Sequence, residues 1–170
     1  MIPSIYLPLL DGTAQIPEDV RALDDQISTL MSLRKTHKHD LILCRGVDLH
    51  HNPDAIELRV IEKAIAVRLA ELDRHVLETA DLICDEKFAE YPDRNPTITS
   101  TEIVCRMYDQ PDYSRKFPKS FRSYFNRGRV GRSVRVYKIL RDSGRYEKMT
   151  TKMNATTYVR TVNGEVRSHV

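Results

Sequence analysis

The chain has 170 residues, with 27 Lys and Arg against 24 Asp and Glu and a net charge of +3. This length suffices for one sizeable core, or for one core with a helical appendage. No apolar run approaches the roughly 18 residues that span a bilayer, and the first ten residues lack the basic segment of a signal peptide. Three cysteines without a CxxC pair favour a reducing, cytoplasmic setting, including that of a host cell or virion.

The first fifteen residues look extended. A helix is then predicted to open at Pro17, because proline and the acids after it suit the first helical turn. The apolar residues that follow recur at spacings of three and four and form one stripe. This helix is expected to end near Lys35, and the run from Leu41 to Cys44 suggests a short strand. The stripe residues are Val20, Leu23, Ile27, Leu30 and Met31.

A second, much longer helix is predicted after Asn52 and Pro53, an asparagine cap followed by proline at the first helical position. No Gly or Pro interrupts residues 54–91, and one apolar face continues from Leu58 to Ile83. This face must pack on the first helix, on the C-terminal half of the chain, or on a second copy. We expect a homo-oligomer formed through residues 54–86.

Residues 91–96, with two prolines, form the best candidate linker, and the charge changes sign there. Residues 1–90 hold ten Lys and Arg against seventeen Asp and Glu, whereas residues 91–170 hold seventeen against seven. Such asymmetry between halves indicates separate tasks. We therefore predict an acidic helical association region over 1–90 and a basic α+β binding region over 91–170.

The basic half is predicted to combine short helices with hairpins, which makes the whole chain α+β. Thr99 to Glu102 fits a capping box, so a helix is expected from Ser100 to Asp109, with a strand as the alternative. A second helix is expected over Pro118–Asn126. The β-branched residues of 133–141 predict a strand that turns at 142–144 and pairs with 145–150. Residues 156–162 and 165–170, around Asn163-Gly164, predict a second hairpin.

Helix, turn, helix and then a hairpin with basic residues at its tip resembles the winged helix-turn-helix DNA-binding domains. The matching segments are TSTEIVCRMYDQPD, FPKSFRSYFNRGR and VRVYKILRDSGRYEKM. The resemblance implies that Pro118–Asn126 is the recognition helix, with its polar face in the major groove. It also implies that Arg141 and Arg145 flank the tip of a wing that reaches a phosphate or the minor groove.

Charge also favours a polyanion partner. Residues 111–150 contain twelve Lys and Arg against three acids, together with seven of the twelve aromatic residues. We predict that DNA, or another nucleic acid, offsets this charge. The aromatic residues Phe117, Phe121 and Phe125 share one helical face and are expected in a core. The predicted nucleic-acid-binding residues are Arg115, Lys116, Lys119, Arg122, Asn126, Arg127, Arg129, Arg132, Arg141 and Arg145.

No motif indicates catalysis, a cofactor or a metal, so the chain is expected to be non-enzymatic. His37, His39, His50 and His51 surround Cys44, but their spacing matches no familiar zinc site, and a polar connector explains them. A metal-dependent nuclease is a minor alternative. The main alternative is an assembly protein, for example a viral component, whose basic segment docks on acidic protein neighbours or on packaged nucleic acid.

Overall fold

A computed structural model of the chain describes residues 2–43, 53–109, 134–150 and 156–161. The chain divides into two compact units, 1–72 and 73–170, and one long helix belongs to both. Long N-terminal helices are followed by a small antiparallel sheet, so the predicted α+β class is confirmed. Within the described residues, no helix is both long and apolar enough to cross a membrane.

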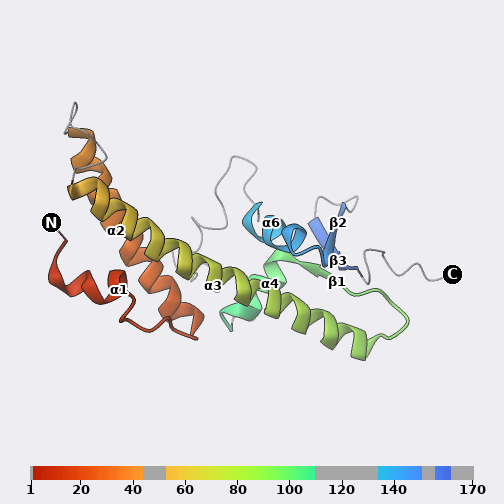
Figure 1. Cartoon of the computed structure of the whole chain (residues 1–170). Coiled ribbons are helices and arrows are strands. Elements are labelled where there is room, and N and C mark those ends of the chain that lie inside the picture. The colour runs from red at the N-terminus through yellow and green to blue at the C-terminus, as the bar shows by residue number, and fades with distance from the viewer. Residues whose placement is uncertain (1, 44–52, 110–133, 151–155, 162–170) are drawn as a thin grey trace. The chain divides into compact units, whose positions relative to one another are not determined.

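The N-terminal unit is helical. A 3-10 turn η1 (Ser4–Tyr6) and a short helix α1 (Leu7–Asp11) precede α2 (Val20–Leu43) and α3 (Pro53–Glu90). The side chain of Asp19 caps α2 by accepting a 2.8 Å hydrogen bond from the backbone N–H of Ala22. Within this unit α2 and α3 lie side by side (Figure 1). The apolar stripes meet there, which is one of the three packings that the sequence left open, and the shared core contains Leu30, Leu33, Ile61, Ala64 and Ile65.

Three local expectations for this unit are wrong. Residues 4–11 are helical rather than extended, because Tyr6, Leu9 and Leu10 pack against the core of the helical pair. Helix α2 continues past Lys35 to Leu43, so the start of the expected strand at 41–44 is helical. The cause is that the buried face continues, since Leu33 and His37 follow Leu30 at spacings of three and four.

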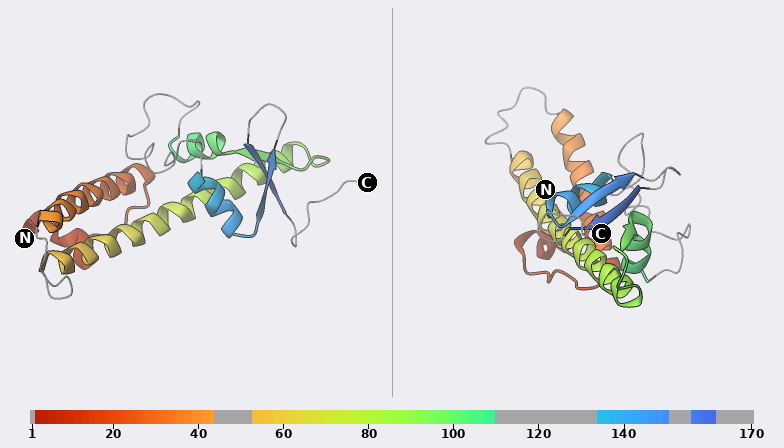
Figure 2. Two further views of the ribbon diagram at one scale, coloured as in Figure 1. Left: turned by 90° about the horizontal axis from the view of Figure 1, so that it is seen from above. Right: turned by 90° about the vertical axis from the view of Figure 1, so that its right-hand side faces the viewer.

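The C-terminal unit combines the last turns of α3 with a small sheet. Its further elements are β1 (Thr97–Thr99), α4 (Ser100–Met107), α6 (Val134–Asp142), β2 (Tyr146–Thr150) and β3 (Thr156–Arg160). The strand order is β1-β3-β2, and both pairings are antiparallel. Tyr158 on the central strand is opposite Ile98 on β1 and Lys148 on β2. Helix α6 leads into β2 and lies beside it (Figure 2).

The capping box that opens α4 is confirmed. The Thr99 hydroxyl accepts a 3.2 Å hydrogen bond from the Glu102 N–H, and the Glu102 carboxylate accepts one of 2.7 Å from the Thr99 N–H. These reciprocal bonds satisfy two backbone donors that a helix start leaves without partners. The prediction of a helix at this segment is therefore confirmed, and the alternative of a strand is wrong.

The strand expected over 133–141 is wrong, because residues 134–142 form helix α6. Val136, Ile139 and Leu140 are buried at helical spacing, and this packing overrides the β propensity of valine and isoleucine. The turn at 143–144 and the strand over 146–150 are confirmed. That strand pairs with β3 rather than with 133–141. Residues 165–170, the partner expected for β3, lie outside the described residues.

The compact units meet within α3, between Leu72 and Asp73, whereas the sequence placed its boundary after residue 90. The physical reason is that the last turns of α3 supply partners to the sheet. Asp81 and Asp85 bond to side chains of β2 and β3, and Cys84 between them is fully buried. The acidic part of the helix is thus a structural component of the basic unit.

Candidate nucleic-acid interface

Helix α6 presents cations on its exposed side. Val136, Ile139 and Leu140 are buried, whereas Lys138 and Arg141 are exposed. The helix ends where Gly144 takes a left-handed conformation with φ of +68°. The Gly144 N–H donates a 2.9 Å hydrogen bond to the Arg141 carbonyl. Glycine adopts this conformation without steric cost, so the chain turns sharply from α6 into β2.

Two cations, Arg141 of α6 and Lys148 of β2, lie over the ring of Tyr137. The Arg141 guanidinium lies 5.5 Å and the Lys148 ammonium 5.3 Å from the centre of its ring. Both distances fall within the range of cation–π attraction. The Tyr137 ring also stacks on Tyr158 of β3, with 6.4 Å between ring centres. We call Tyr137, Lys138, Arg141 and Lys148 the α6–β2 basic cluster, and it combines positive charge with an aromatic side chain.

The cations of this cluster are paired unequally. Arg141 forms an ion pair with its neighbour Asp142, which together with the associated hydrogen bond raises the pKa of the Arg141 guanidinium. Among the residues that the structure describes, neither Lys138 nor Lys148 pairs with a carboxylate. Both side chains are exposed.

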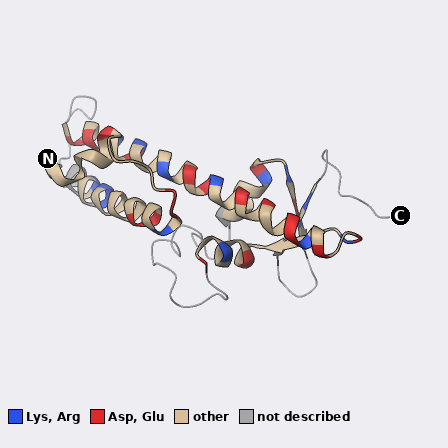
Figure 3. Ribbon diagram, turned by 90° about the horizontal axis from the view of Figure 1, so that it is seen from below, with Lys and Arg blue, Asp and Glu red and all other residues tan. Residues whose placement is uncertain are grey.

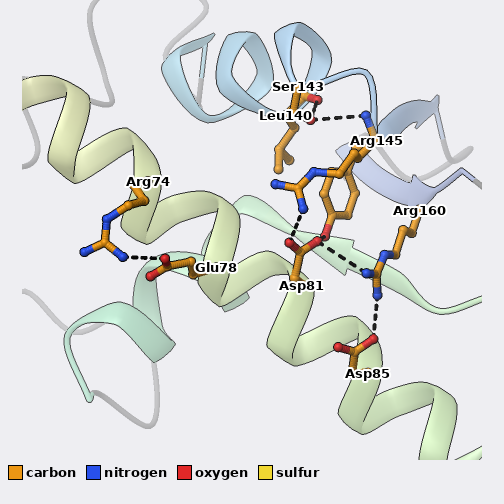
Figure 4. Close-up of polar contacts among 9 residues, drawn as sticks. Arg74, Glu78, Asp81, Asp85, Leu140, Ser143, Arg145 and Arg160 are labelled. Carbon is orange, nitrogen blue, oxygen red and sulfur yellow. Dashed lines mark hydrogen bonds and ion pairs between the residues drawn. The ribbon is translucent and has the colours of Figure 1, made fainter.

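Other cations of the basic half are instead bound to acids of α3 (Figure 4). The Arg145 guanidinium lies 2.5 Å from Oδ2 of Asp81, and the Arg160 guanidinium lies 2.5 Å from Oδ1 of Asp85. Arg106 on α4 pairs with Glu86. These pairs remain partly exposed, so each contributes modestly to stability, on the order of 0–1 kcal/mol. Their consequence is that the charges of these arginines are offset by acids of the same chain.

Burial raises the pKa of two groups beside these ion pairs. Burial and a hydrogen bond to Asp81 raise the pKa of the Tyr146 hydroxyl above its usual range. Burial also raises the pKa of the Cys84 thiol to about 11. Both groups are therefore protonated at neutral pH, and Cys84 lacks the thiolate character that a reactive cysteine needs.

Charge along α3 is mixed in sign over most of its length (Figure 3). Its last turns are mostly acidic, with Asp81, Asp85, Glu86 and Glu90 against Lys87. Lys87 itself is turned to α4, where its ammonium lies 2.5 Å from the Glu102 carboxylate and 2.8 Å from the Thr97 carbonyl. The end of α3 therefore offers little positive charge to an external polyanion.

Eight of the ten predicted binding residues lie outside the described residues, and their role stays a prediction: Arg115, Lys116, Lys119, Arg122, Asn126, Arg127, Arg129 and Arg132. The expected recognition helix over 118–126 also lies there. The two remaining residues do not flank a hairpin tip, which corrects the predicted wing. Arg141 is near the end of α6, and Arg145 precedes β2 and pairs with Asp81.

Sequence reasoning missed Tyr137, Lys138 and Lys148 as members of one surface. The pattern that could have revealed them is the spacing of Val136, Ile139 and Leu140, which fits a helix and leaves Lys138 and Arg141 opposite. The proximity of Lys148 comes from the fold, since β2 follows α6 through a tight turn.

Within the described part of the chain, one group of side chains is close enough to hold a metal ion. It consists of His37, Asp54 and Glu57 in the N-terminal unit. No such group lies on α6 or on the described strands.

Comparison of the chain with models of known protein families, with curated proteins and with solved structures finds no match.

Proposed function

We propose that this chain is a non-enzymatic DNA-binding protein whose C-terminal unit contacts the duplex through α6 and the β2–β3 hairpin. The observation that carries the proposal is the α6–β2 basic cluster. Lys138 and Lys148 are exposed and unpaired within the described residues, and Arg141 and Lys148 lie within 5.5 Å of the centre of the Tyr137 ring. Such cations bind phosphate oxygens and release condensed counterions, which supplies much of the affinity for nucleic acid.

The order of elements supports the same proposal. Among the described elements, helix α4 is followed by α6 and then by the antiparallel pair β2–β3. This is the helix, helix and hairpin pattern of the winged helix-turn-helix resemblance, but with a different helix before the hairpin. We therefore assign the recognition role to α6 rather than to residues 118–126. Lys138 and Arg141 would face the groove, and Lys148 would contact the phosphate backbone.

The internal ion pairs indicate which cations of the C-terminal unit would contact DNA. Arg145 and Arg160 bind Asp81 and Asp85 of α3, and Arg106 of α4 binds Glu86 of α3, so the charges of these arginines are offset within the chain. Acidic side chains of the same chain thus offset part of the basic charge. The proposal leaves α6, β2 and the basic residues of 110–133 as the surface for the polyanion.

Exposed apolar side chains on α3 support self-association of the N-terminal unit. Ile56, Val60 and Val67 are 49%, 40% and 46% exposed. At 100° per residue they lie within about 40° of one another around the helix. A stripe of this kind on a long helix suits packing against a second copy. We propose that the chain dimerises along this stripe.

The test is a titration of a short DNA duplex with the full chain at several salt concentrations. For the wild type, the logarithm of the binding constant should fall linearly with the logarithm of salt concentration. The variant Lys148→Ala should lower that slope by about 0.9, since Lys148 is assigned to the phosphate backbone and each phosphate contact contributes about 0.9. Arg74→Ala is the matched control, because Arg74 is an exposed cation of the same unit that pairs with Glu78.

Absence of binding at low salt would contradict the proposal. A single-stranded RNA in parallel would identify the polyanion, because tighter binding of RNA at equal salt would exclude duplex DNA as the preferred partner. A stable oligomer that binds neither nucleic acid would favour the assembly alternative.

A further inference from the structure

A buried histidine faces two carboxylates in the N-terminal unit. His37 belongs to α2 and is only 4% exposed. Its Nδ1 atom makes no hydrogen bond to any residue that the structure describes. Buried polar atoms nearly always have a partner, so this atom requires an explanation.

The first turn and a half of α3 supplies the carboxylates. Asp54 and Glu57 are three residues apart and thus share one side of the helix. Oε2 of Glu57 lies 3.5 Å from Nδ1 of His37. Ligand atoms of His37, Asp54 and Glu57 all lie within 4.8 Å of one another. Two helices therefore bring one imidazole nitrogen and two carboxylates to a common point.

We propose that His37, Asp54 and Glu57 form a binding site for a divalent first-row transition metal such as Zn²⁺. The 3.5 Å between Nδ1 and Oε2 is longer than an ordinary hydrogen bond. It matches the separation of two ligands on one tetrahedral Zn²⁺, which is about 3.4 Å for bonds of about 2.0–2.2 Å. A shared ion would satisfy the His37 nitrogen.

The chemistry of the three ligand side chains indicates which class of metal ion would bind. One imidazole with two carboxylates suits Zn²⁺ and its borderline neighbours better than Mg²⁺ or Ca²⁺, which prefer oxygen ligands alone. Three protein ligands leave a fourth position for water, as in open zinc sites. The ion would join α2 to α3. This inference rests on the N-terminal unit alone and is independent of the proposed DNA binding.

The test uses the full chain without a histidine tag, stripped of metal by EDTA and dialysed. Calorimetric titration with Zn²⁺ should give one equivalent bound per chain. His37→Gln and Glu57→Gln should each weaken Zn²⁺ binding more than about tenfold, since even loss of an outer hydrogen-bonding partner often costs that much. His39→Gln is the matched control, because His39 is an exposed histidine two residues along the same helix. Binding that is unchanged in His37→Gln would overturn the site.

A second measurement on the wild type avoids variants that fold poorly. Zn²⁺ at a hundredfold excess over its Kd should raise the thermal midpoint by about 5 °C or more, and EDTA should reverse the rise. Co²⁺ in place of Zn²⁺ should give the visible absorption of a tetrahedral site. If neither Zn²⁺ nor EDTA changed the thermal unfolding midpoint, the proposal would be overturned. His37 and Glu57 would then form an ion pair without a metal.

Discussion

The hydroxyl of Tyr146 donates a 2.6 Å hydrogen bond to Oδ1 of Asp81, which joins β2 to α3. The other oxygen of the same carboxylate pairs with Arg145. Asp81 thus bonds to two consecutive residues, Arg145 and Tyr146. Its carboxylate accepts the hydrogen bond of the Tyr146 hydroxyl, whose residue is almost completely buried. An acid from the half of the chain with excess negative charge is a structural part of the basic unit.

Removing the phenol should destabilise the C-terminal unit. Tyr146→Phe deletes the hydrogen bond to Asp81 with little change in shape, so we expect a loss of about 1 kcal/mol in unfolding free energy. The thermal midpoint should fall by roughly 2–4 °C. Glu78→Gln is the control, because its pair with Arg74 is about half exposed and should contribute little. An equal effect of both variants in thermal unfolding would contradict this role of Tyr146.

Alkaline pH should weaken the same region. The pKa of Cys84 rises from 9.0 to about 11 on folding, and the pKa of Tyr146 is raised as well. Between pH 9 and about pH 11 the unfolded chain releases the Cys84 proton while the folded chain retains it, so unfolding becomes more favourable as pH rises. The stabilisation is complete below pH 9 and is lost progressively up to about pH 11.

Urea unfolding at a series of pH values measures this effect. The midpoint should decline between pH 9 and 11, and Cys84→Ala should decline less steeply over that interval because the titrating thiol is absent. A wild-type midpoint that is constant over this interval would show that neither group keeps its proton through burial.

The sequence predicted the long helices α2 and α3, helix α4 and the strands β2 and β3, but it predicted a strand where α6 lies. The stripes of α2 and α3 extend over many turns, and Thr99 with Glu102 provides a local capping pattern that needs no distant partner. Residues 134–142 are short, and their valines also suit a strand, so only packing decides between the two structures. The pairing of β3 with β1 joins residues about sixty positions apart, which no local pattern reveals.

The candidate sites were predictable to different degrees. Basic charge near residues 138–148 is visible in the sequence, but the pairing of Arg145 with Asp81 depends on contact across 64 residues. The grouping of His37 with Asp54 and Glu57 is likewise a product of the hairpin of helices. The spacing of the histidines suggests other histidines as partners of His37, whereas its two partners in the structure, Asp54 and Glu57, are carboxylates on the next helix.

Basic residues outside the described part of the chain should be distinguishable from those on α6. If residues 118–126 read bases as the sequence suggests, Arg122→Ala should reduce discrimination between duplex sequences. Arg129→Ala should weaken all duplexes equally, as expected for a phosphate contact. If α6 is the reading helix, Lys138→Ala should reduce discrimination instead. Anisotropy titrations against two unrelated duplexes at one salt concentration would separate these outcomes.

Self-association should depend on the exposed stripe of α3. Val67→Lys places a charge between two copies of that stripe, and an unpaired charge in an apolar interface is costly. We expect sedimentation equilibrium to show a dimer for the wild type and a monomer for Val67→Lys. Ile5→Lys is the matched control, because Ile5 is 77% exposed but lies outside α3. Because DNA contacts are assigned to the other unit, monomeric Val67→Lys should retain binding with lower apparent affinity. A wild-type monomer at all concentrations would contradict the stripe as an interface.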